Sequence, residues 1–279
     1  RHGADRVIDT PVAESGIVGA AFGMAVAGLR PIAELQFMGF SYPAVDQIIN
    51  HVGRIRNRSR HRFSAPMVIR IPHAAGIGAA EHHSESAEAI YAHTPGVKVV
   101  VPATPYDAKG LLLEAVADPD PVIFLEPIRI YRALKEDVPD EAYTVPIGVA
   151  VVEREGADVT IVSYGAMMRE VRVAADELAA LGIAVELVDL RTLSPLDADT
   201  IVESARKTGR VVAVQEAHRT AGLASEVAAI VQEQALYSLL APVERVTGWD
   251  IVVPLRRAEK HHVPSVGRIV AAARRTLKG

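Results

Sequence analysis

Short apolar runs and amphipathic stretches alternate along the 279 residues of this chain. In the first half, runs rich in Val, Ile and Leu predict strands at residues 31–37, 67–71, 97–101 and 122–125. Apolar positions at helical spacing predict helices at residues 41–56 and 107–117, and a short helical stretch at 87–92. This alternation is typical of α/β proteins with mainly parallel sheets.

The second half repeats the pattern more regularly. Strands are predicted at residues 159–163, 185–190 and 211–215. Helices are predicted at residues 167–181, 197–207, 223–236 and 266–277. Between the halves, residues 134–146 are rich in proline and charge without an apolar period, which predicts a linker. We therefore expect two domains, residues 1–140 and 141–279.

A carboxylate, Glu14, stands at the start of a predicted helix with many small residues. These recur at three- and four-residue steps, at Gly16, Gly19, Ala20, Gly23 and Ala27. A glycine inside a helix costs about 1 kcal/mol relative to alanine, so the pattern indicates that another backbone or a ligand comes close. Two interpretations stay open here: a ligand site, or a tight helix–helix contact with Glu14 as an exposed acid that suits the helix dipole.

Composition narrows the function classes. The chain is 49% apolar and 23% charged with a net charge of −4, which argues against nucleic acid or an anionic membrane as the main partner. It has no cysteine, so disulfides, thiolate metal sites and cysteine nucleophiles are excluded. No apolar run approaches the roughly 20 residues of a bilayer span, and no signal-peptide pattern opens the chain. We expect a cytoplasmic protein; because it starts at Arg1 rather than methionine, we also expect part of the natural N-terminus to be missing.

A loop of small residues at 73–80 leads into the adjacent histidines His82 and His83. Three interpretations stay open: a metal site with Glu81 or Glu85, a surface loop, or an active-site loop that presents one histidine as an acid or base. Aromatic residues around Gly39 either wall a pocket at the end of a strand or pack in the core.

The basic run at residues 54–62 suggests a phosphate site, but a solvated helix end or a subunit contact fits an acidic chain better. The chain also lacks a glycine-rich phosphate fingerprint of the Rossmann or P-loop type. If a phosphorylated cofactor binds, something other than such a fingerprint must hold its phosphates.

Several motifs together resemble one family over essentially the whole chain. They are DTP at 9–11, ELQF at 34–37, DQI at 46–48, HSES at 83–86, PYDAKGL at 105–111, EP at 126–127, DLRTL at 189–193, KTGR at 207–210 and QEA at 215–217. The chain resembles the beta subunits of the thiamine-diphosphate-dependent component of 2-oxoacid dehydrogenase complexes, a transketolase-like family. The resemblance implies an α/β pyrimidine-binding domain followed by a transketolase C-terminal-like α/β domain.

The resemblance also assigns roles to residues. Glu14 matches the catalytic glutamate that hydrogen-bonds the aminopyrimidine ring, where a carboxyl group favours the imino tautomer that takes the proton from the thiazolium carbon. Phe40 matches the aromatic residue that packs on the pyrimidine, and Gln36 lies in the same cofactor-binding segment. His83 matches the catalytic histidine that meets the substrate carboxylate or assists transfer to the lipoyl group.

The same resemblance implies partners. Magnesium and the diphosphate are held mainly by an alpha subunit with a Gly-Asp-Gly motif, which this chain lacks, in an α2β2 heterotetramer. The small-residue helix then crosses a subunit interface, and a lipoyl-bearing acyltransferase core and a small 2-oxoacid are the further partners. Related subunits bind a structural potassium through backbone carbonyls, and the matching positions are Ala65, Met67, Val68, Ala115, Asp118 and Asp120.

Some features depart from the family pattern. Members have a helix and a strand before the position of Arg1. Bacterial pyruvate-type members have an acid where Pro43 stands, and branched-chain members have proline, whereas residues 37–42 and 215–217 resemble the pyruvate type. The missing acid puts in doubt a carboxylate relay between two active sites. Pyruvate, branched-chain 2-oxoacids and acetoin stay open as substrates, as do a transketolase-like enzyme half and a non-catalytic assembly subunit that docks the acyltransferase core.

Overall fold

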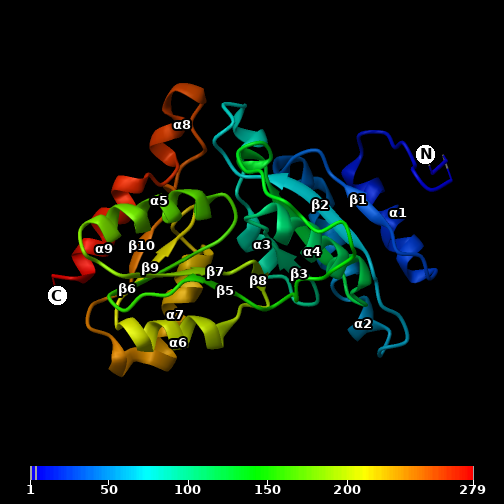
Figure 1. The fold of residues 1–279 in the computed structure, drawn as a ribbon. Helices are drawn as coiled ribbons and strands as arrows, with labels where there is room; N and C mark the ends of the chain where they lie inside the picture. Colours follow the sequence, from blue (N-terminus) through cyan, green and yellow to red (C-terminus); the bar gives the residue numbers. More distant parts are fainter. Residues whose placement is uncertain (1, 4, 279) are drawn as a thin grey trace.

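The computed structural model describes residues 2–3 and 5–278, which form two five-stranded sheets with helices packed on them (Figure 1). The strand orders are β1-β2-β4-β3-β8 and β10-β9-β6-β7-β5. In each sheet one edge strand, β8 or β5, is antiparallel and the other pairings are parallel. The α/β class with mainly parallel sheets, predicted from the sequence, is therefore confirmed.

The first sheet is built mainly from the first half of the chain. Its strands are β1 (Ile32–Glu34), β2 (Val68–His73), β3 (Lys98–Val100), β4 (Val122–Pro127) and β8 (Thr192–Ser194). Its helices are α1 (Glu14–Val26), α2 (Ile55–Arg58), α3 (Glu88–Ala92) and α4 (Pro105–Ala117). The central strands β2 and β4 have no fully exposed position, which is why they read as nearly continuous apolar runs.

The second sheet comes entirely from the second half. Its strands are β5 (Val151–Arg154), β6 (Val159–Ser163), β7 (Val185–Asp189), β9 (Val211–Val214) and β10 (Glu244–Val246). Its helices are α5 (Met167–Ala180), α6 (Ala198–Thr208), α7 (Leu223–Ala235), α8 (Arg256–His262) and α9 (Val266–Thr276).

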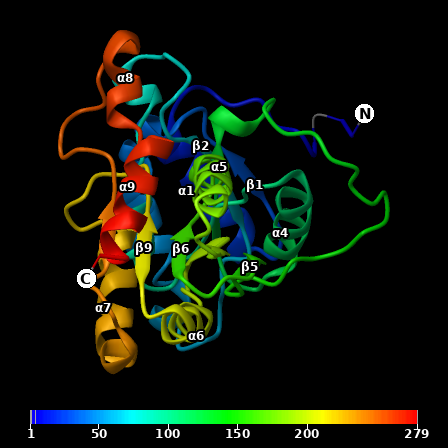
Figure 2. The same cartoon turned by 60° about the vertical axis from the view of Figure 1, so that its left-hand side comes forward.

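Helices cover both faces of this second sheet (Figure 2). Because side chains alternate along a strand, Val212 and Val214 of β9 pack with α5 and α9, whereas Val211 and Ala213 pack with α6 and α7. Helix α8 stands apart and lies beside the loop that follows β2 of the first sheet (Figures 1 and 2).

The prediction of one regular helix over residues 41–56 is wrong. The chain there forms a 3₁₀ helix η1 (Met38–Ala44), a π-helix η2 (Gln47–Val52) and then the short α2. Pro43 has no N–H to continue an α-helical ladder. Gly53 ends η2 where a Cβ would lie 2.8 Å from Pro95 O, so only glycine fits there without a shift. The apolar spacing does mark the buried side of this segment, with Ile48 and Val52 buried, but the backbone of residues 38–52 departs from the α-helical form.

Other boundaries agree better. Helix α4 begins at Pro105 with Thr104 as its cap, since Thr104 Oγ1 accepts a hydrogen bond from Asp107 N at 3.0 Å. Residues 131–150 contain no strand or helix, in agreement with the predicted linker. Strands β5, β8 and β10 and helix α8 were not predicted. Strand β8 follows the predicted domain boundary near residue 140, yet it pairs with β3 of the first sheet.

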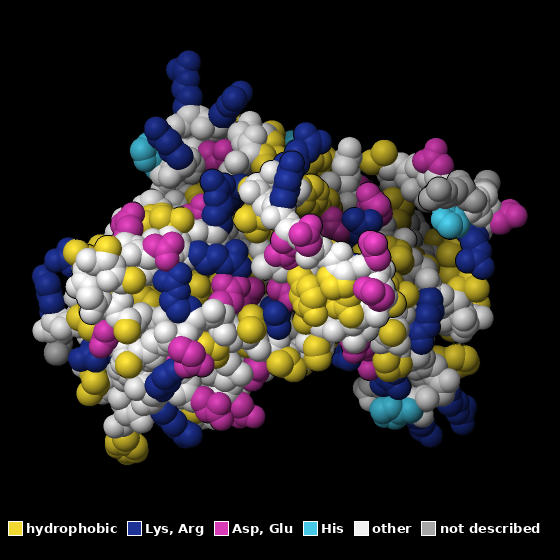
Figure 3. Space-filling view, viewed as in Figure 1, with side chains coloured by type: hydrophobic (Ala, Val, Ile, Leu, Met, Phe, Trp, Pro, Cys, Tyr) yellow, Lys and Arg dark blue, Asp and Glu magenta, His cyan; other side chains and the backbone are white. Residues whose placement is uncertain are grey.

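No helix in the described part of the chain combines the length and apolar character that a bilayer crossing requires. Two further short 3₁₀ helices matter for the site, namely η3 (Glu81–His83) and η4 (Ile128–Ile130). On the face shown in Figure 3, acidic and basic side chains are interspersed over the second sheet, and basic side chains gather over α8.

Candidate active site

Glu14 is the first residue of α1, and its carboxylate is half-exposed at the positive end of the helix dipole. Ser15 Oγ donates a hydrogen bond of 2.5 Å to Pro43 O, which ties the helix start to η1. Helix α1 packs on η2 at Gly19, where an added Cβ would make an ordinary contact of 3.5 Å with Gln47 Oε1. No hydrogen bond or ion pair joins the Glu14 carboxylate to another described residue. The carboxylate is therefore available to a ligand.

At Gly16 and Gly23, the small-residue face of α1 is not packed against the rest of the described chain. A Cβ added at Gly23 would meet no atom within 4 Å, and one added at Gly16 would meet only Ala13 Cβ at 3.8 Å. The close helix–helix contact that the sequence predicts is therefore not made within the described chain. The interpretation as a subunit interface requires a second chain at this face.

Aromatic rings surround His83. Its ring centroid lies 4.4 Å from that of Phe37 and 5.2 Å from that of Phe40, both edge-on. The neighbouring His82 ring lies 4.2 Å away. Gly39 allows this packing, because a Cβ there would lie 2.2 Å from His82 O. His83 Nδ1 is buried and has no hydrogen-bond partner among the described residues, which leaves one polar atom for a ligand.

The structure brings only some of the four residues predicted to contact cofactor or substrate into contact with one another. Phe40 and His83 are in contact, and Glu14 is linked to the segment of Phe40 through the bond between Ser15 and η1. Gln36 is exposed after β1, next to Phe37. Their roles toward a cofactor stay predictions.

Two phenols have hydroxyl partners in the segments around these rings. Tyr42 donates a hydrogen bond of 3.0 Å from its hydroxyl to Glu85 Oε2, and the hydroxyl of Tyr91 is bonded to that of Ser41. Burial raises the pKa of Tyr91 to about 12. Burial and then the charge of Glu85 raise the pKa of Tyr42 further above its usual range. Both phenols are therefore neutral at physiological pH.

A second group of polar side chains is buried where the two sheets meet. This interdomain cluster consists of His73, Glu88, Arg129, Tyr164, Glu170 and Glu216. Arg129 bridges two of its acids, with Nη1 2.5 Å from Glu170 Oε1 and Nη2 3.2 Å from Glu216 Oε2. Tyr164 donates a hydrogen bond of 2.8 Å from its hydroxyl to Glu88 Oε1.

Burial dominates the titration of this cluster. Desolvation raises the pKa of Glu216 to about 7, even though the charge of Arg129 acts in the opposite direction. It also raises the pKa of Glu88. For His73, desolvation lowers the pKa to about 4, so the imidazole is neutral at physiological pH.

The metal interpretation of the adjacent histidines gains no support from the geometry. His82 Nδ1 lies 3.7 Å from Glu81 Oε1. However, no group of three His, Cys, Asp or Glu side chains among residues 2–3 and 5–278 is arranged to hold a metal ion. Of the open interpretations of this loop, the packing of His83 favours the active-site one.

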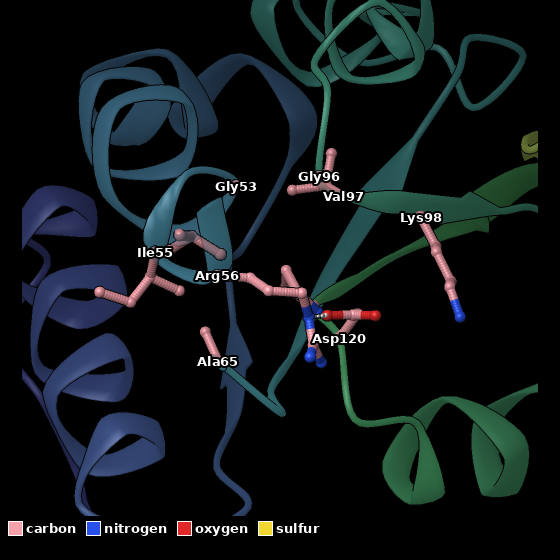
Figure 4. Close-up of a pocket in the computed structure, with 10 residues that line it drawn as sticks. Gly53, Ile55, Arg56, Ala65, Gly96, Val97, Lys98 and Asp120 are labelled. Carbon is pink, nitrogen blue, oxygen red and sulfur yellow. Dashed lines mark hydrogen bonds and ion pairs between the residues drawn. The ribbon is translucent and has the colours of Figure 1, made fainter. Parts of the chain in front are cut away.

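The residues predicted to offer carbonyls to potassium lie near the opposite end of β2. Ala65 and Asp120 line a recess beside α2 and β3, and Figure 4 shows Arg56 reaching across it toward Asp120. Arg56 Nε lies 2.6 Å from Asp120 Oδ1. Lys98 Nζ, next to the recess, lies 2.5 Å from Asp118 Oδ2.

Protein donors already bind two of these carbonyls. Arg30 Nη1 donates to Asp118 O at 2.9 Å and to Val116 O at 2.7 Å. Met67 O accepts a hydrogen bond of 3.0 Å from Val122 N. A guanidinium thus brings positive charge to the end of α4 where potassium is predicted. The donor set fits the ion only in part, and no chemical step is derived through it.

Sequence reasoning did not single out the interdomain cluster. Glu216 carried a usable signal, because an acid that follows an apolar strand directly lies at the carboxyl end of a parallel sheet, where ligands and polar contacts gather. Arg129 and Glu170 carried none, since each lies in a stretch of ordinary amphipathic character.

Comparison with known families agrees with this two-domain organisation. Residues 1–133 match the family described as "Transketolase, pyrimidine binding domain". Residues 148–269 match "Transketolase, C-terminal domain". Among solved structures, a chain titled "Split gene transketolase, inactive beta4 tetramer" superposes with a TM-score of 0.79 at 28% identity, covering 95% of this chain and 82% of that one. The predicted order of a pyrimidine-binding domain and a transketolase C-terminal-like domain is confirmed.

Curated relatives are more similar still. "Pyruvate dehydrogenase E1 component subunit beta" of Acholeplasma laidlawii is 52% identical over 278 residues, which cover 100% of this chain and 85% of the relative. The protein of the same name from Bacillus subtilis is 49% identical over 276 residues, which cover 99% of this chain and 85% of the relative. At this identity over nearly its whole length, the chain belongs to the family of pyruvate dehydrogenase E1 component beta subunits.

Proposed function

We propose that this chain, with an alpha subunit, forms a thiamine-diphosphate-dependent dehydrogenase that decarboxylates pyruvate and transfers the acyl group to a lipoyl domain. The observation that carries the proposal is the packing of His83 against Phe37 and Phe40, with a buried ring nitrogen that has no hydrogen-bond partner among the described residues. The half-exposed carboxylate of Glu14 lies at the start of the helix tied to the same segment. The names of the relatives support pyruvate as the substrate.

The chain's own residues suit the aminopyrimidine end of the cofactor. When bound, thiamine diphosphate supplies the carbanion stabilisation that decarboxylation requires. Glu14 would share a proton with the pyrimidine ring, which a carboxyl group without an intramolecular partner is free to do. Phe40 would hold the ring plane, with Gln36 at the edge of the site. His83 would direct its free ring nitrogen at the substrate or the lipoyl group.

An alpha subunit would hold the rest of the cofactor. The absence of a Gly-Asp-Gly motif supports placing the magnesium and diphosphate on that subunit. The uncovered small-residue face of α1 supports a helix contact within an α2β2 heterotetramer. The solved relative described as an inactive beta4 tetramer is, by its title, a beta-only assembly without activity. This supports the need for an alpha partner here.

The decisive experiment is isothermal titration of thiamine diphosphate and magnesium into the chain alone, and then into its mixture with the candidate alpha subunit. Binding only to the mixture is the expected result, since the site is shared between the two chains. Tight binding to the chain alone would contradict the proposal, because this chain would then hold the diphosphate itself.

Substrate choice needs a separate assay. We expect the complex to reduce a lipoyl domain with pyruvate at a higher kcat/KM than with branched-chain 2-oxoacids or acetoin. Preference for branched-chain substrates would instead agree with Pro43, which the branched-chain members share. Activity on a ketose phosphate without a lipoyl acceptor would favour a transketolase-like enzyme half. If the assembled complex has no turnover and still docks the acyltransferase core, the chain is an assembly subunit.

Two finer points belong to the same proposal. Lack of cysteine supports a reducing, cytoplasmic compartment.

A structural potassium is supported only by the positions of the six matched residues, and the hydrogen-bond donors on Met67 O and Asp118 O compete with it. Thermal unfolding in potassium chloride against sodium chloride at equal ionic strength tests the ion. A potassium-specific rise in Tm is the supporting result, and equal Tm values would remove the ion from the proposal.

A further inference from the structure

The loop ahead of His83 is held by two carboxylates from the second domain. Ala75 N donates a hydrogen bond of 2.5 Å to Glu216 Oε1. Gly76 N donates one of 2.7 Å to Glu259 Oε1, and Gly78 N donates one of 2.9 Å to Glu259 Oε2. Three amides of one short loop thus bind two acids that follow it in sequence by more than 130 residues.

The backbone of this loop is shaped to present those amides. Ala74, Gly76 and Gly78 have φ angles of +75°, +97° and +70°. Such left-handed positions turn successive N–H groups to one side and create an anion-binding concavity. A Cβ at Gly76 would lie 2.2 Å from Arg129 Cδ, and one at Gly78 would lie 3.1 Å from Arg256 Cγ. The loop therefore packs closely on Arg129 of its own domain and on Arg256 of the second domain.

The carboxylate that binds two amides is buried. Glu259 is 6% exposed, although it belongs to α8, a seven-residue helix beside the loop (Figures 1 and 2). Both of its oxygens accept a backbone N–H, and hydrogen bonds to an ionised acceptor are roughly twice as strong as neutral ones. The chain after α7 also holds α8, since Trp249 Nε1 donates a hydrogen bond of 2.9 Å to His261 O. Glu259 is thus a fixed anchor.

The anchored loop leads directly to the imidazole. His83 N donates a hydrogen bond of 3.0 Å to Ala80 O, and Ser84 Oγ donates one of 3.2 Å to the same oxygen. The His83 ring has contacts with Phe37 and Phe40, but no hydrogen bond from another described residue to its Nδ1 fixes the direction of the ring. The direction of the ring therefore depends on the path of the backbone that carries it.

We propose that Glu259 is a positioning residue for His83. Its carboxylate fixes the loop at Gly76 and Gly78, so that the second domain sets where the imidazole points in the active site. The proposal rests on the proposed function for what His83 does, but the anchoring of the loop can be measured without any turnover.

The test uses Glu259→Gln in the assembled complex, with Glu233→Gln on the exposed side of α7 as the matched control. A glutamine has one carboxamide oxygen, so it cannot accept with both head-group atoms and has no charge. We expect faster hydrogen exchange at the amides of residues 75–83 in Glu259→Gln only. We also expect kcat of lipoyl reduction to fall roughly tenfold with KM for the 2-oxoacid nearly unchanged, since misplacement of a reacting group costs rate. Glu259→Asp keeps the charge and should restore part of kcat.

A double variant separates positioning from general damage. If Glu259 acts through His83, Glu259→Gln should cause no further loss in a His83→Ala background. An equal loss in both backgrounds, or unchanged exchange and kcat, would overturn the proposal. Should Glu259→Gln fail to fold, Gly78→Ala disturbs the same contact from the loop side and should give the same pattern. If the wild-type complex lacks 2-oxoacid activity, the proposed function fails, and hydrogen exchange alone decides whether Glu259 anchors the loop.

Discussion

The face around Glu14 and His83 and the interdomain cluster contrast in how their polar groups are satisfied. The Glu14 carboxylate has no partner among the described residues, and His83 Nδ1 is buried without one. In the interdomain cluster, Glu88, Glu170 and Glu216 each accept a hydrogen bond from a side chain of the same cluster. Four buried atoms of the cluster still have no partner among the described residues: His73 Nδ1, Glu88 Oε2, Arg129 Nε and Glu170 Oε2. What differs is the ion pairing: the Glu14 carboxylate has no pairing cation among the described residues and is available to a ligand, whereas the acids that share Arg129 depend on it for stability. The first region should therefore control activity and the second stability.

Glu14→Gln gives the sharpest separation of the two regions. We expect turnover of the assembled complex to fall by roughly 10²–10⁴-fold, the usual contribution of a positioned acid or base, with Tm nearly unchanged. Glu177→Gln on the exposed side of α5 is the control and should leave both unchanged. The measurement is kcat of lipoyl reduction together with thermal unfolding. Substantial activity in Glu14→Gln would contradict the proposed role of the carboxylate in sharing a proton with the pyrimidine ring.

Arg129→Met should lower stability more than turnover, the reverse of Glu14→Gln. Removing the cation leaves Glu170 and Glu216 buried without their shared partner, which costs about 3–5 kcal/mol of unfolding free energy. The loss should be smaller at pH 6 than at pH 8, because a protonated Glu216 does not need the cation. Urea unfolding at both pH values measures it. Arg154→Met, which breaks an exposed pair with Asp176, is the control and should cost less than about 1 kcal/mol.

His73 should give the cluster a recognisable pH dependence. Its pKa falls from 6.5 to about 4 on folding, so between these values the unfolded chain binds more protons than the native one. Its contribution to stability is complete above pH 6.5 and is lost as the pH falls through 4, by up to about 3 kcal/mol.

Urea unfolding from pH 7 to pH 4 should therefore show a shallower decline for His73→Asn than for the exposed control His93→Asn. Glu216 contributes with the opposite sign, because its raised pKa makes stability fall as the pH rises toward 7. The variants must for this reason be compared with each other at each pH. Identical slopes would contradict the buried, neutral state of His73.

Tyr42→Phe should have the smallest effect. It removes one partly exposed hydrogen bond to Glu85, and such a bond contributes about 1 kcal/mol. We expect kcat to stay within about twofold of the wild-type value, because the phenol does not touch the His83 ring in the ring contacts described. Tyr131→Phe, which removes a hydroxyl bond to Glu126 away from these rings, is the matched control. A much larger loss of kcat in Tyr42→Phe alone would place the Tyr42 hydroxyl in the site.

The sequence was most informative where a residue's role depends on its neighbours in the chain. The helix that begins at Glu14, the strand before His73 and the helix capped by Thr104 were all found from local patterns. The 3₁₀ and π turns of η1 and η2 were missed, because apolar spacing reports which face is buried and not which hydrogen-bond ladder forms.

The site was predicted only in part, for a related reason. Phe40 and His83 are 43 positions apart; their roles were inferred from a family resemblance rather than from any local pattern, and only the folded chain shows that they are in contact. The pairing of Glu259 with Gly76 and Gly78 spans more than 180 residues and carries no periodicity, so only the folded chain reveals it. The short edge strand β8 was missed because three residues are too few for an alternating pattern to be recognised.

Strand β8 has a consequence for how the protein is made. In the described chain, residues 192–194 pair with β3 in antiparallel orientation, and without them β3 would be an open edge of the first sheet. During synthesis the N-terminal domain emerges first and begins to fold on its own. Its sheet then carries an open edge until the polypeptide has grown past Ser194, and an open edge is a template for pairing with other chains. Nascent chains stalled before that point should therefore associate with one another. If the gene is split near residue 140, the N-terminal fragment should precipitate unless the C-terminal fragment is produced with it.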